Sequence, residues 1–144
     1  MTRYCLDTNI LSYAIQPRPS QLLLQWLGER RDEDLFVATL TIAEIWRGIL
    51  QKPDGQKRRE LAAWFSGPEG PPKLFEGRIL AFDEDAAMIW ARLMAEGKAQ
   101  GRPRSPLDMI IAAVAAANDC VVATANSRDF EGVPGQGFET GFWA

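Results

Sequence analysis

Three acidic residues have neighbours that suggest more than a solvated surface charge. Asp7 directly follows the apolar run Tyr4–Leu6 in "YCLDTNIL", Glu44 lies in "TIAEIWRGI", and Asp108 lies in "SPLDMIIAAVA". Three carboxylates brought together repel one another unless a cation lies between them. Oxygen ligands favour Mg²⁺ or Mn²⁺ over zinc, and such an ion activates water and neutralises charge on a phosphate. These acids therefore predict phosphodiester hydrolysis at a metal site.

Each acid also has a purely structural explanation. Asp7 is of a type that favours turns. Thr41 and Glu44 have the spacing of a helix capping box, and Ser105 and Asp108 repeat that spacing further along the chain. Capping does not exclude a second role, because an acid in the first turn of a helix is stabilised by the helix dipole and stays ionised.

A fourth polar position follows the apolar run "VVATA", which covers residues 121–125. Asn126 stands directly after this run, and Asp129 comes three residues later. Both are ordinary turn residues, and either one is also a candidate to complete the site. We expect Asn126 to be a neutral hydrogen-bond partner. Asp129 is expected to have a secondary role, because three residues of loop displace it from the end of the strand.

The composition excludes several other kinds of site. The chain has no histidine, which removes Ser-His-Asp and Cys-His catalysis and every histidine-ligated metal site. It also lacks the glycine-rich motifs that hold nucleotide phosphates. The net charge of -3 argues against binding nucleic acid through overall charge. Such binding would need local basic patches or an acidic site neutralised by metal.

The size and segment pattern predict one folded domain without a membrane span. At 144 residues, the chain fits a single domain over residues 1–144. It has neither the N-terminal pattern of a signal peptide nor an apolar run long enough to cross a bilayer, so we expect a cytoplasmic protein. Cys5 and Cys120 adjoin strand-like runs and are expected to be buried reduced thiols.

Strand-like and helix-like segments alternate along the chain. Strands are expected at residues 3–6, 34–39, 78–82 and 121–125, with an edge strand near Phe138; helices are expected at 9–14, from Ser20, at 41–52, 57–65, from Asp83 through Met94, and at 106–118. Residues 67–72 are expected to form a loop. This alternation predicts an α/β fold around a mainly parallel sheet. Such sheets place functional groups at the carboxyl ends of their strands, where Asp7 stands.

Four ordered motifs extend over nearly the whole chain: "YCLDTNIL", "TIAEIWRGI", "PLDMIIAAVA" and "VVATANSRDFEGVPG". With these motifs the sequence resembles PIN-domain ribonucleases, in particular the VapC-type and FitB-like toxins of bacterial toxin–antitoxin pairs. The resemblance implies a three-layer α/β/α sandwich and an RNase activity that depends on Mg²⁺ or Mn²⁺. It also implies a homodimer that a cognate antitoxin inhibits, with contact to DNA only through that antitoxin.

The resemblance also assigns residues. It matches Asp7, Glu44 and Asp108 to the three acids of the family's metal site, and Thr8 and Asn9 to the polar pair that supports the first acid. The family often has an aspartate directly after the fourth strand, where this chain has Asn126 and its nearest acid is Asp129. The fourth ligand is therefore a departure from the family pattern.

Basic and large apolar residues suggest the partners. Four arginines flank the predicted site and are candidate contacts to RNA phosphates, with simple solvation as the alternative: Arg47, Arg102, Arg104 and Arg128. Five large apolar residues lie on expected helices and predict a homodimer with helical faces in contact: Trp26, Leu27, Trp64, Phe65 and Trp90.

Three other functions fit part of the pattern. A phosphatase of the haloacid dehalogenase type would need a second aspartate two residues after Asp7, where the chain has Asn9. A receiver domain that accepts a phosphoryl group would need an acidic pair near the first strand and a lysine after the last, and neither is present. An inactive PIN domain used only for binding would not need three acids. The metal-dependent ribonuclease fits best.

Overall fold

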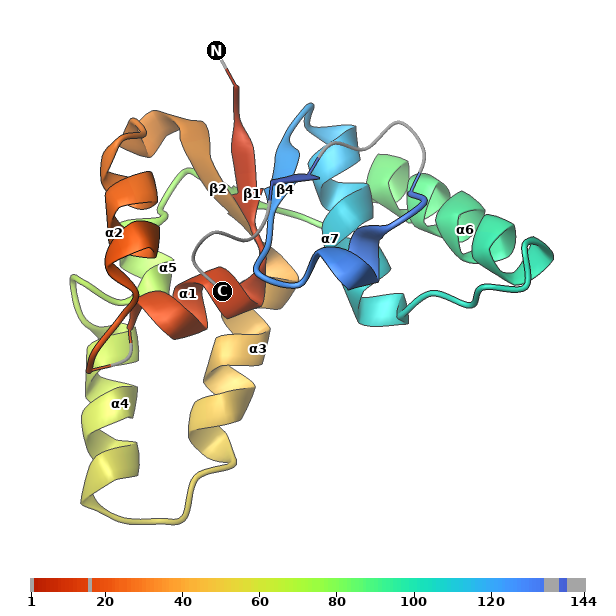
Figure 1. The fold of residues 1–144 in the computed structure, drawn as a ribbon. Helices are drawn as coiled ribbons and strands as arrows, with labels where there is room; N and C mark the ends of the chain where they lie inside the picture. Colours follow the sequence, from red (N-terminus) through yellow and green to blue (C-terminus); the bar gives the residue numbers. More distant parts are fainter. Residues whose placement is uncertain (1, 16, 134–137, 140–144) are drawn as a thin grey trace.

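The computed structural model describes residues 2–15, 17–133 and 138–139, and a parallel sheet lies at its centre (Figure 1). The strands are β1 (Tyr4–Leu6), β2 (Leu35–Ala38), β3 (Ile79–Leu80), β4 (Val121–Ala123) and β5 (Phe138–Glu139). Their order is β3-β2-β1-β4-β5, and each neighbouring pair is parallel. The order of strands reverses at β1, so the topological switch point lies between β1 and β4. The predicted α/β fold is confirmed.

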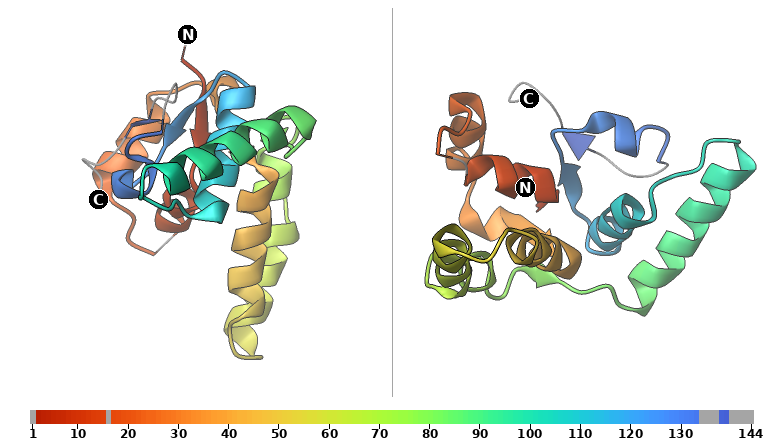
Figure 2. Two further views of the ribbon diagram at one scale, coloured as in Figure 1. Left: turned by 90° about the vertical axis from the view of Figure 1, so that its right-hand side faces the viewer. Right: turned by 90° about the horizontal axis from the view of Figure 1, so that it is seen from below.

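Helices cover both faces of the sheet. One layer contains α1 (Thr8–Ala14), α2 (Gln21–Gly28), α3 (Thr39–Leu50), α4 (Gln56–Ser66) and α5 (Pro71–Leu74), and the other contains α6 (Glu84–Ala99) and α7 (Pro106–Ala117). Figure 2 shows α6 and α7 grouped at one side, with the remaining helices at the other. This arrangement confirms the predicted α/β/α sandwich.

Alternation along the short strands explains the two layers. Tyr4 and Leu6 of β1 pack with the helices of the first layer, whereas Cys5 between them packs against α6 and α7. Successive side chains of a strand point to opposite faces, so a three-residue strand can contribute to two separate cores. Cys5 and Cys120 are both buried and free, as predicted.

The α3–α4 hairpin projects away from the sheet. Its two helices lie side by side and are joined by residues 51–55 (Figures 1 and 2). The rings of Trp46 and Phe65 are 4.9 Å apart between centroids and hold the helices together near the sheet. The outer part of the hairpin is therefore a surface that the sheet does not cover.

The N-terminal caps of three helices were predicted correctly. Ser20, Asp83 and Ser105 each accept a hydrogen bond from the backbone N–H three residues later, at Leu23, Ala86 and Asp108. These caps satisfy backbone donors that have no partner within the helix. The position of Asp108 in the first turn of α7 follows from the cap at Ser105.

Other local predictions were wrong. Thr41 and Glu44 do not form a capping box, because α3 begins at Thr39 and Thr41 is fully buried inside the helix. Residues 71–74 form the short helix α5 instead of a loop, since Pro71 fits the first position of a helix. Asp34 belongs to a 3₁₀ turn, η1 (Asp32–Asp34), that precedes β2. No helix within the described ranges is long and apolar enough to cross a membrane.

Candidate active site

Asp7 lies at the carboxyl end of the central strand and its carboxylate is held on both oxygens. Oδ1 accepts the backbone N–H of Thr8 at 2.8 Å, and so caps α1. Oδ2 accepts the hydroxyl of Thr124 at 2.8 Å and the amide of Asn9 at 3.2 Å. The side chain is only 5% exposed. Its turn-forming role and its place in the site are therefore combined in one residue.

Thr124 connects the ends of β1 and β4, and it was not predicted as a site residue. Its hydroxyl oxygen accepts the backbone N–H of Asn126 at 3.0 Å while donating to Asp7. Asn9 adds a second connection, because its Oδ1 accepts the backbone N–H of Ala125 at 3.2 Å. Thr124 was detectable in principle, because it is the first residue after a buried strand, as Asp7 is after β1. The predicted supporting role of Asn9 has this geometric basis.

Glu44 reaches the same edge from the second turn of α3. Its Oε1 accepts the hydroxyl of Thr8 at 2.6 Å, and Thr8 Oγ1 also lies 3.3 Å from Thr41 Oγ1. Arg47 places a guanidinium nitrogen 3.8 Å from Oε2, and most of the Arg47 side chain remains exposed. Thr8 therefore joins Asp7 to Glu44 through its backbone and its side chain.

Asp108 approaches the edge from the opposite helical layer. It is half-buried in the first turn of α7. Burial raises the pKa of its carboxyl to about 6, and the charges of Asp129 and Asp7 raise it further, while a hydrogen bond with Ser105 acts in the other direction. The N-terminus of α7 thus points toward the acidic edge, as the site required.

Asn126 and Asp129 form a unit of their own. Asn126 Nδ2 donates to Asp129 Oδ2 at 2.5 Å, and the two residues begin and lie within a second 3₁₀ turn, η2 (Ser127–Phe130). Asn126 does not directly follow β4, since that strand ends at Ala123 and Thr124 takes the expected place. Asp129 lies close enough to Asp7 and Asp108 to raise the pKa of both carboxyls.

The charges at this edge are unbalanced. Burial raises the pKa of Asp7, which hydrogen bonds from Thr124 and Thr8 lower, and the charges of Glu44 and Asp129 raise it again. Negative groups that disfavour one another's ionisation are a donor set that fits a hard divalent cation. Within residues 2–15 and 17–133, no three such side chains already stand at the spacing of metal ligands. The fit is therefore one of chemistry and position.

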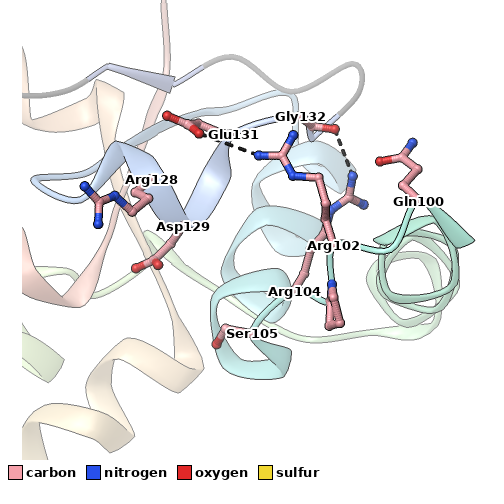
Figure 3. A pocket seen from close by; sticks show the side chains of 9 residues that line it. Gln100, Arg102, Arg104, Ser105, Arg128, Asp129, Glu131 and Gly132 are labelled. Atoms are coloured by element: carbon pink, nitrogen blue, oxygen red, sulfur yellow. Dashed lines mark hydrogen bonds and ion pairs between the residues drawn. The ribbon is translucent and has the colours of Figure 1, made fainter. Parts of the chain in front are cut away.

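The four predicted arginines have different surroundings. Arg102 and Arg128 are exposed and line a cavity of about 140 Å³ beside Asp129 (Figure 3). The guanidinium of Arg104 donates to the carbonyl oxygens of Leu93 at 2.6 Å and Gly132 at 2.8 Å. Its side chain is 7% exposed, so the prediction that Arg104 contacts RNA phosphates was wrong: the residue ties α6 to the segment after η2.

Comparison with known sequences gives a consistent result. The family described as PIN domain matches residues 4–136. The chain is 34% identical to toxin FitB of Neisseria gonorrhoeae over 125 residues, which are 87% of this chain and 88% of the relative. It is also 34% identical to the VapC ribonuclease Y4jK of Sinorhizobium fredii over 126 residues, 88% of this chain and 89% of the relative.

Solved structures extend the likeness to the fold. The structure of FitAB bound to the IR36 DNA fragment contains a chain with a TM-score of 0.86 and 30% identity, covering 95% of this chain and 94% of that one. A DNA-bound VapBC structure from Salmonella typhimurium gives a TM-score of 0.77 at 25% identity and covers the full length of both chains.

Proposed function

Because the chain belongs to the PIN-domain family of VapC- and FitB-type ribonuclease toxins, we propose that Asp7, Glu44 and Asp108 are the catalytic acids of its metal-dependent ribonuclease site. One observation carries the assignment. Acids from distant parts of the chain meet at the carboxyl edge of the sheet, where they raise one another's pKa. The structural location is the switch point at which α/β sheets commonly place their sites.

The residues divide the work of hydrolysis between them. Asp7 is held in one orientation by Thr8 and Thr124, so its carboxylate presents a fixed ligand. Asp108 supplies a second ligand from α7, and Glu44 acts as a ligand directly or through water. When bound, a Mg²⁺ or Mn²⁺ ion supplies the positive charge that activates water and neutralises the phosphate. The family is generally metal-dependent, and this choice of ion is our proposal.

The fourth position is assigned to a pair of residues. Asn126 holds the carboxylate of Asp129 through its amide, and brings no charge itself. Asp129 then has a secondary role, adding negative potential beside Asp108 and orienting water. The chain thus replaces the family's common aspartate with the neutral Thr124 directly after β4, and retains an acid three residues beyond Asn126.

The proposed partners follow from the family. Related structures contain FitAB and VapBC complexes bound to DNA. We expect a cognate antitoxin to inhibit this chain, and contact with DNA to occur only through that antitoxin. RNA as the substrate places the activity in the cytoplasm. Residues 1–144 are proposed to act as a single PIN-domain unit.

A homodimer is also proposed, although the surface that supports it differs from the sequence expectation. Trp26 is buried within one chain and is not available for a dimer contact. By contrast, Phe82, Met88 and Leu107 are exposed beside α6 and at the start of α7, with Met88 60% exposed. Exposed apolar groups on neighbouring helices favour association. Light scattering at micromolar concentration should give the mass of a dimer without antitoxin, and a monomer would contradict the proposal.

RNA cleavage tests the proposed function. The purified chain should cleave RNA in Mg²⁺ or Mn²⁺, and EDTA should abolish cleavage. Asp83→Asn is a matched control, because Asp83 caps α6 away from the acidic edge. Cleavage that continues undiminished in EDTA would contradict the metal-dependent site.

A further inference from the structure

Two cavities adjoin the acidic edge, and each includes one of its acids. The first includes Glu44 and lies between α1, α3 and α4; the second includes Asp129 and lies between η2 and the loop before α7. We propose that these cavities are two substrate subsites, in which a single strand of RNA places a base in the first and a phosphate in the second. This inference rests on the proposed ribonuclease function, and adds the path of the substrate.

The first cavity, which we call the base groove, has a volume of about 340 Å³. Ile15, Leu61 and Trp64 form its apolar wall, and Lys52 and Lys57 lie at its open side. Both lysines are exposed, and Glu44 is the one acid among the described residues of the lining. An apolar and aromatic wall beside mobile cations is what unpaired bases and their phosphates require.

The charge of the hairpin supports an anionic occupant. The α3–α4 hairpin carries five cations against three acids, although the net charge of the whole chain is -3. Its cations are Arg47, Lys52, Lys57, Arg58 and Arg59. The basic residues therefore gather on the arm that leads away from the acidic edge. Local positive charge of this kind contacts phosphates even on an acidic protein.

The second cavity, which we call the phosphate pocket, is small and polar. Figure 3 shows Arg102, Arg128 and Ser105 around its opening, with Asp129 at one side. Arg102 is paired with Glu131 only loosely, at 3.8 Å, and its side chain is 71% exposed. An exposed pair of this kind is weak, so a phosphate can take the place of the Glu131 carboxylate at little cost.

The phosphate pocket is held in place by Arg104. Its two hydrogen bonds to Leu93 and Gly132 join α6 to the segment after η2. Gly97 permits this contact, because a Cβ atom there would lie 2.9 Å from Arg104 Cγ. The exposed Arg102 is two residues from this fixed point. The pocket is therefore built on a braced loop, which suits it to holding a phosphate at a set distance from Asp108.

The base groove also continues into a third cavity of about 440 Å³. Ile15 and Trp64 line both, but the third cavity is mainly apolar, with Leu27, Leu74 and Phe75 in its wall. Such a surface suits a protein segment better than RNA. The lysines lie at the base groove and not in the third cavity, which is why we assign RNA to the groove alone.

Binding of RNA can be measured without cleavage in an Asp108→Asn background. Fluorescence anisotropy of a labelled ten-nucleotide single strand would be compared for the parent and for two double variants, Lys52→Ala/Lys57→Ala and Arg102→Ala/Arg128→Ala. Each double variant should raise the Kd at least about fivefold and lower the salt dependence by one or two phosphate contacts, about 0.7 of slope for each. Lys73→Ala and Arg92→Ala are controls, because these exposed residues line neither subsite.

Two further probes separate bases from phosphates. An abasic strand of equal length keeps the phosphates and should bind several-fold more weakly than RNA to the parent. A duplex of the same sequence should also bind more weakly, because its bases are paired and stacked. Equal binding of the abasic strand would overturn the base assignment of the groove.

The outcomes distinguish this inference from the proposed function. If the lysine double variant binds RNA as the parent does while the unmodified chain cleaves RNA, the base groove belongs to a protein partner and our assignment is overturned. The same result for the arginine double variant would overturn the phosphate pocket. If both double variants lose RNA affinity but the unmodified chain cleaves no RNA, the subsites stand and the proposed function fails.

Discussion

Asp7 and Asp108 are both acids of the candidate site, but the chain holds them in different ways. Asp7 is almost fully buried and accepts hydrogen bonds from Thr8, Asn9 and Thr124 at the end of the central strands. Asp108 is half-buried, and lies beside Asp129 with a hydrogen bond to Ser105. The first half of the site is therefore fixed by the sheet, whereas the second half is built from a helix end and a 3₁₀ turn.

The difference indicates how the site is organised. The hydrogen bonds around Asp7 stabilise its ionised form and partly offset its burial. Asp108 faces Asp129, a second acid, and its carboxyl has a pKa of about 6. The described structure thus leaves the excess negative charge mainly in the half that is less rigid. A bound cation would stabilise that half most, so loss of charge there should have the largest effect.

The largest expected effect follows from removing one of the two ligands. Asp108→Asn and Asp7→Asn should each reduce RNA cleavage by more than about 100-fold, since a ligand and its charge are lost together. Single-turnover cleavage rates under saturating Mn²⁺ would measure this. Asp83→Asn makes the same chemical change at a helix cap outside the site and should cleave at the parent rate. Cleavage within tenfold of the parent in Asp108→Asn would remove Asp108 from the site.

The rigid half can be loosened without changing charge. Thr124→Val keeps the shape of the side chain but removes the hydroxyl that donates to Asp7 and accepts from Asn126. Cleavage should fall about 10- to 100-fold, and stability by about 1–3 kcal/mol, because buried polar groups lose their partner. Chemical denaturation and cleavage rates would be measured together. Thr39→Val is the control, since the Thr39 hydroxyl bonds the carbonyl of Leu80 at an exposed position. Equal effects in both variants would show that Thr124 does not position Asp7.

A smaller effect is expected at the fourth position. Asp129→Asn should lower cleavage only several-fold, because the residue adds charge beside Asp108 without being one of the proposed ligands. Metal titrations of Asp129→Asn and Asp108→Asn in parallel would rank the two acids. If Asp129→Asn loses metal affinity as severely as Asp108→Asn, then Asp129 is the missing fourth acid.

The smallest effect concerns stability and pH without metal. A carboxyl with a raised pKa holds its proton in the folded state when the unfolded chain has lost it, so stability falls as pH rises between about 4 and 6. We expect the metal-free chain to have a higher Tm at pH 5 than at pH 7, by a few degrees. Asp108→Asn should reduce this difference, and Mg²⁺ should raise the Tm at pH 7. A pH dependence unchanged in Asp108→Asn would contradict the charge assignment at Asp108.

Much of this arrangement was predictable because its signals are local. Asp7 follows a buried strand, and the cap at Ser105 places Asp108 in the first turn of a helix. Glu44 was predicted from a capping box that does not form, because Thr41 lies inside α3. Its position was still correct, since α3 begins at the carboxyl end of β2 whichever residue caps it.

The remaining features depend on contacts between distant parts of the chain. Thr124 bonds to Asp7 across 117 residues, and a threonine after a strand gives no local sign of its partner. Arg104 resembled the other arginines near the site, but its burial depends on the path of α6 and on the small size of Gly97. Local patterns therefore identified the acids, whereas the residues that orient them became visible only in three dimensions.

The central claim is that Asp7 and Asp108 bind one divalent ion. Calorimetric titration of Mn²⁺ into the metal-free chain, into Asp7→Asn, Asp108→Asn and the control Asp83→Asn tests it most directly. We predict a saturable site in the parent and in Asp83→Asn, with affinity at least tenfold weaker in each of the other two variants. Parent-like Mn²⁺ affinity in both Asp7→Asn and Asp108→Asn, with each variant folded, would contradict the account.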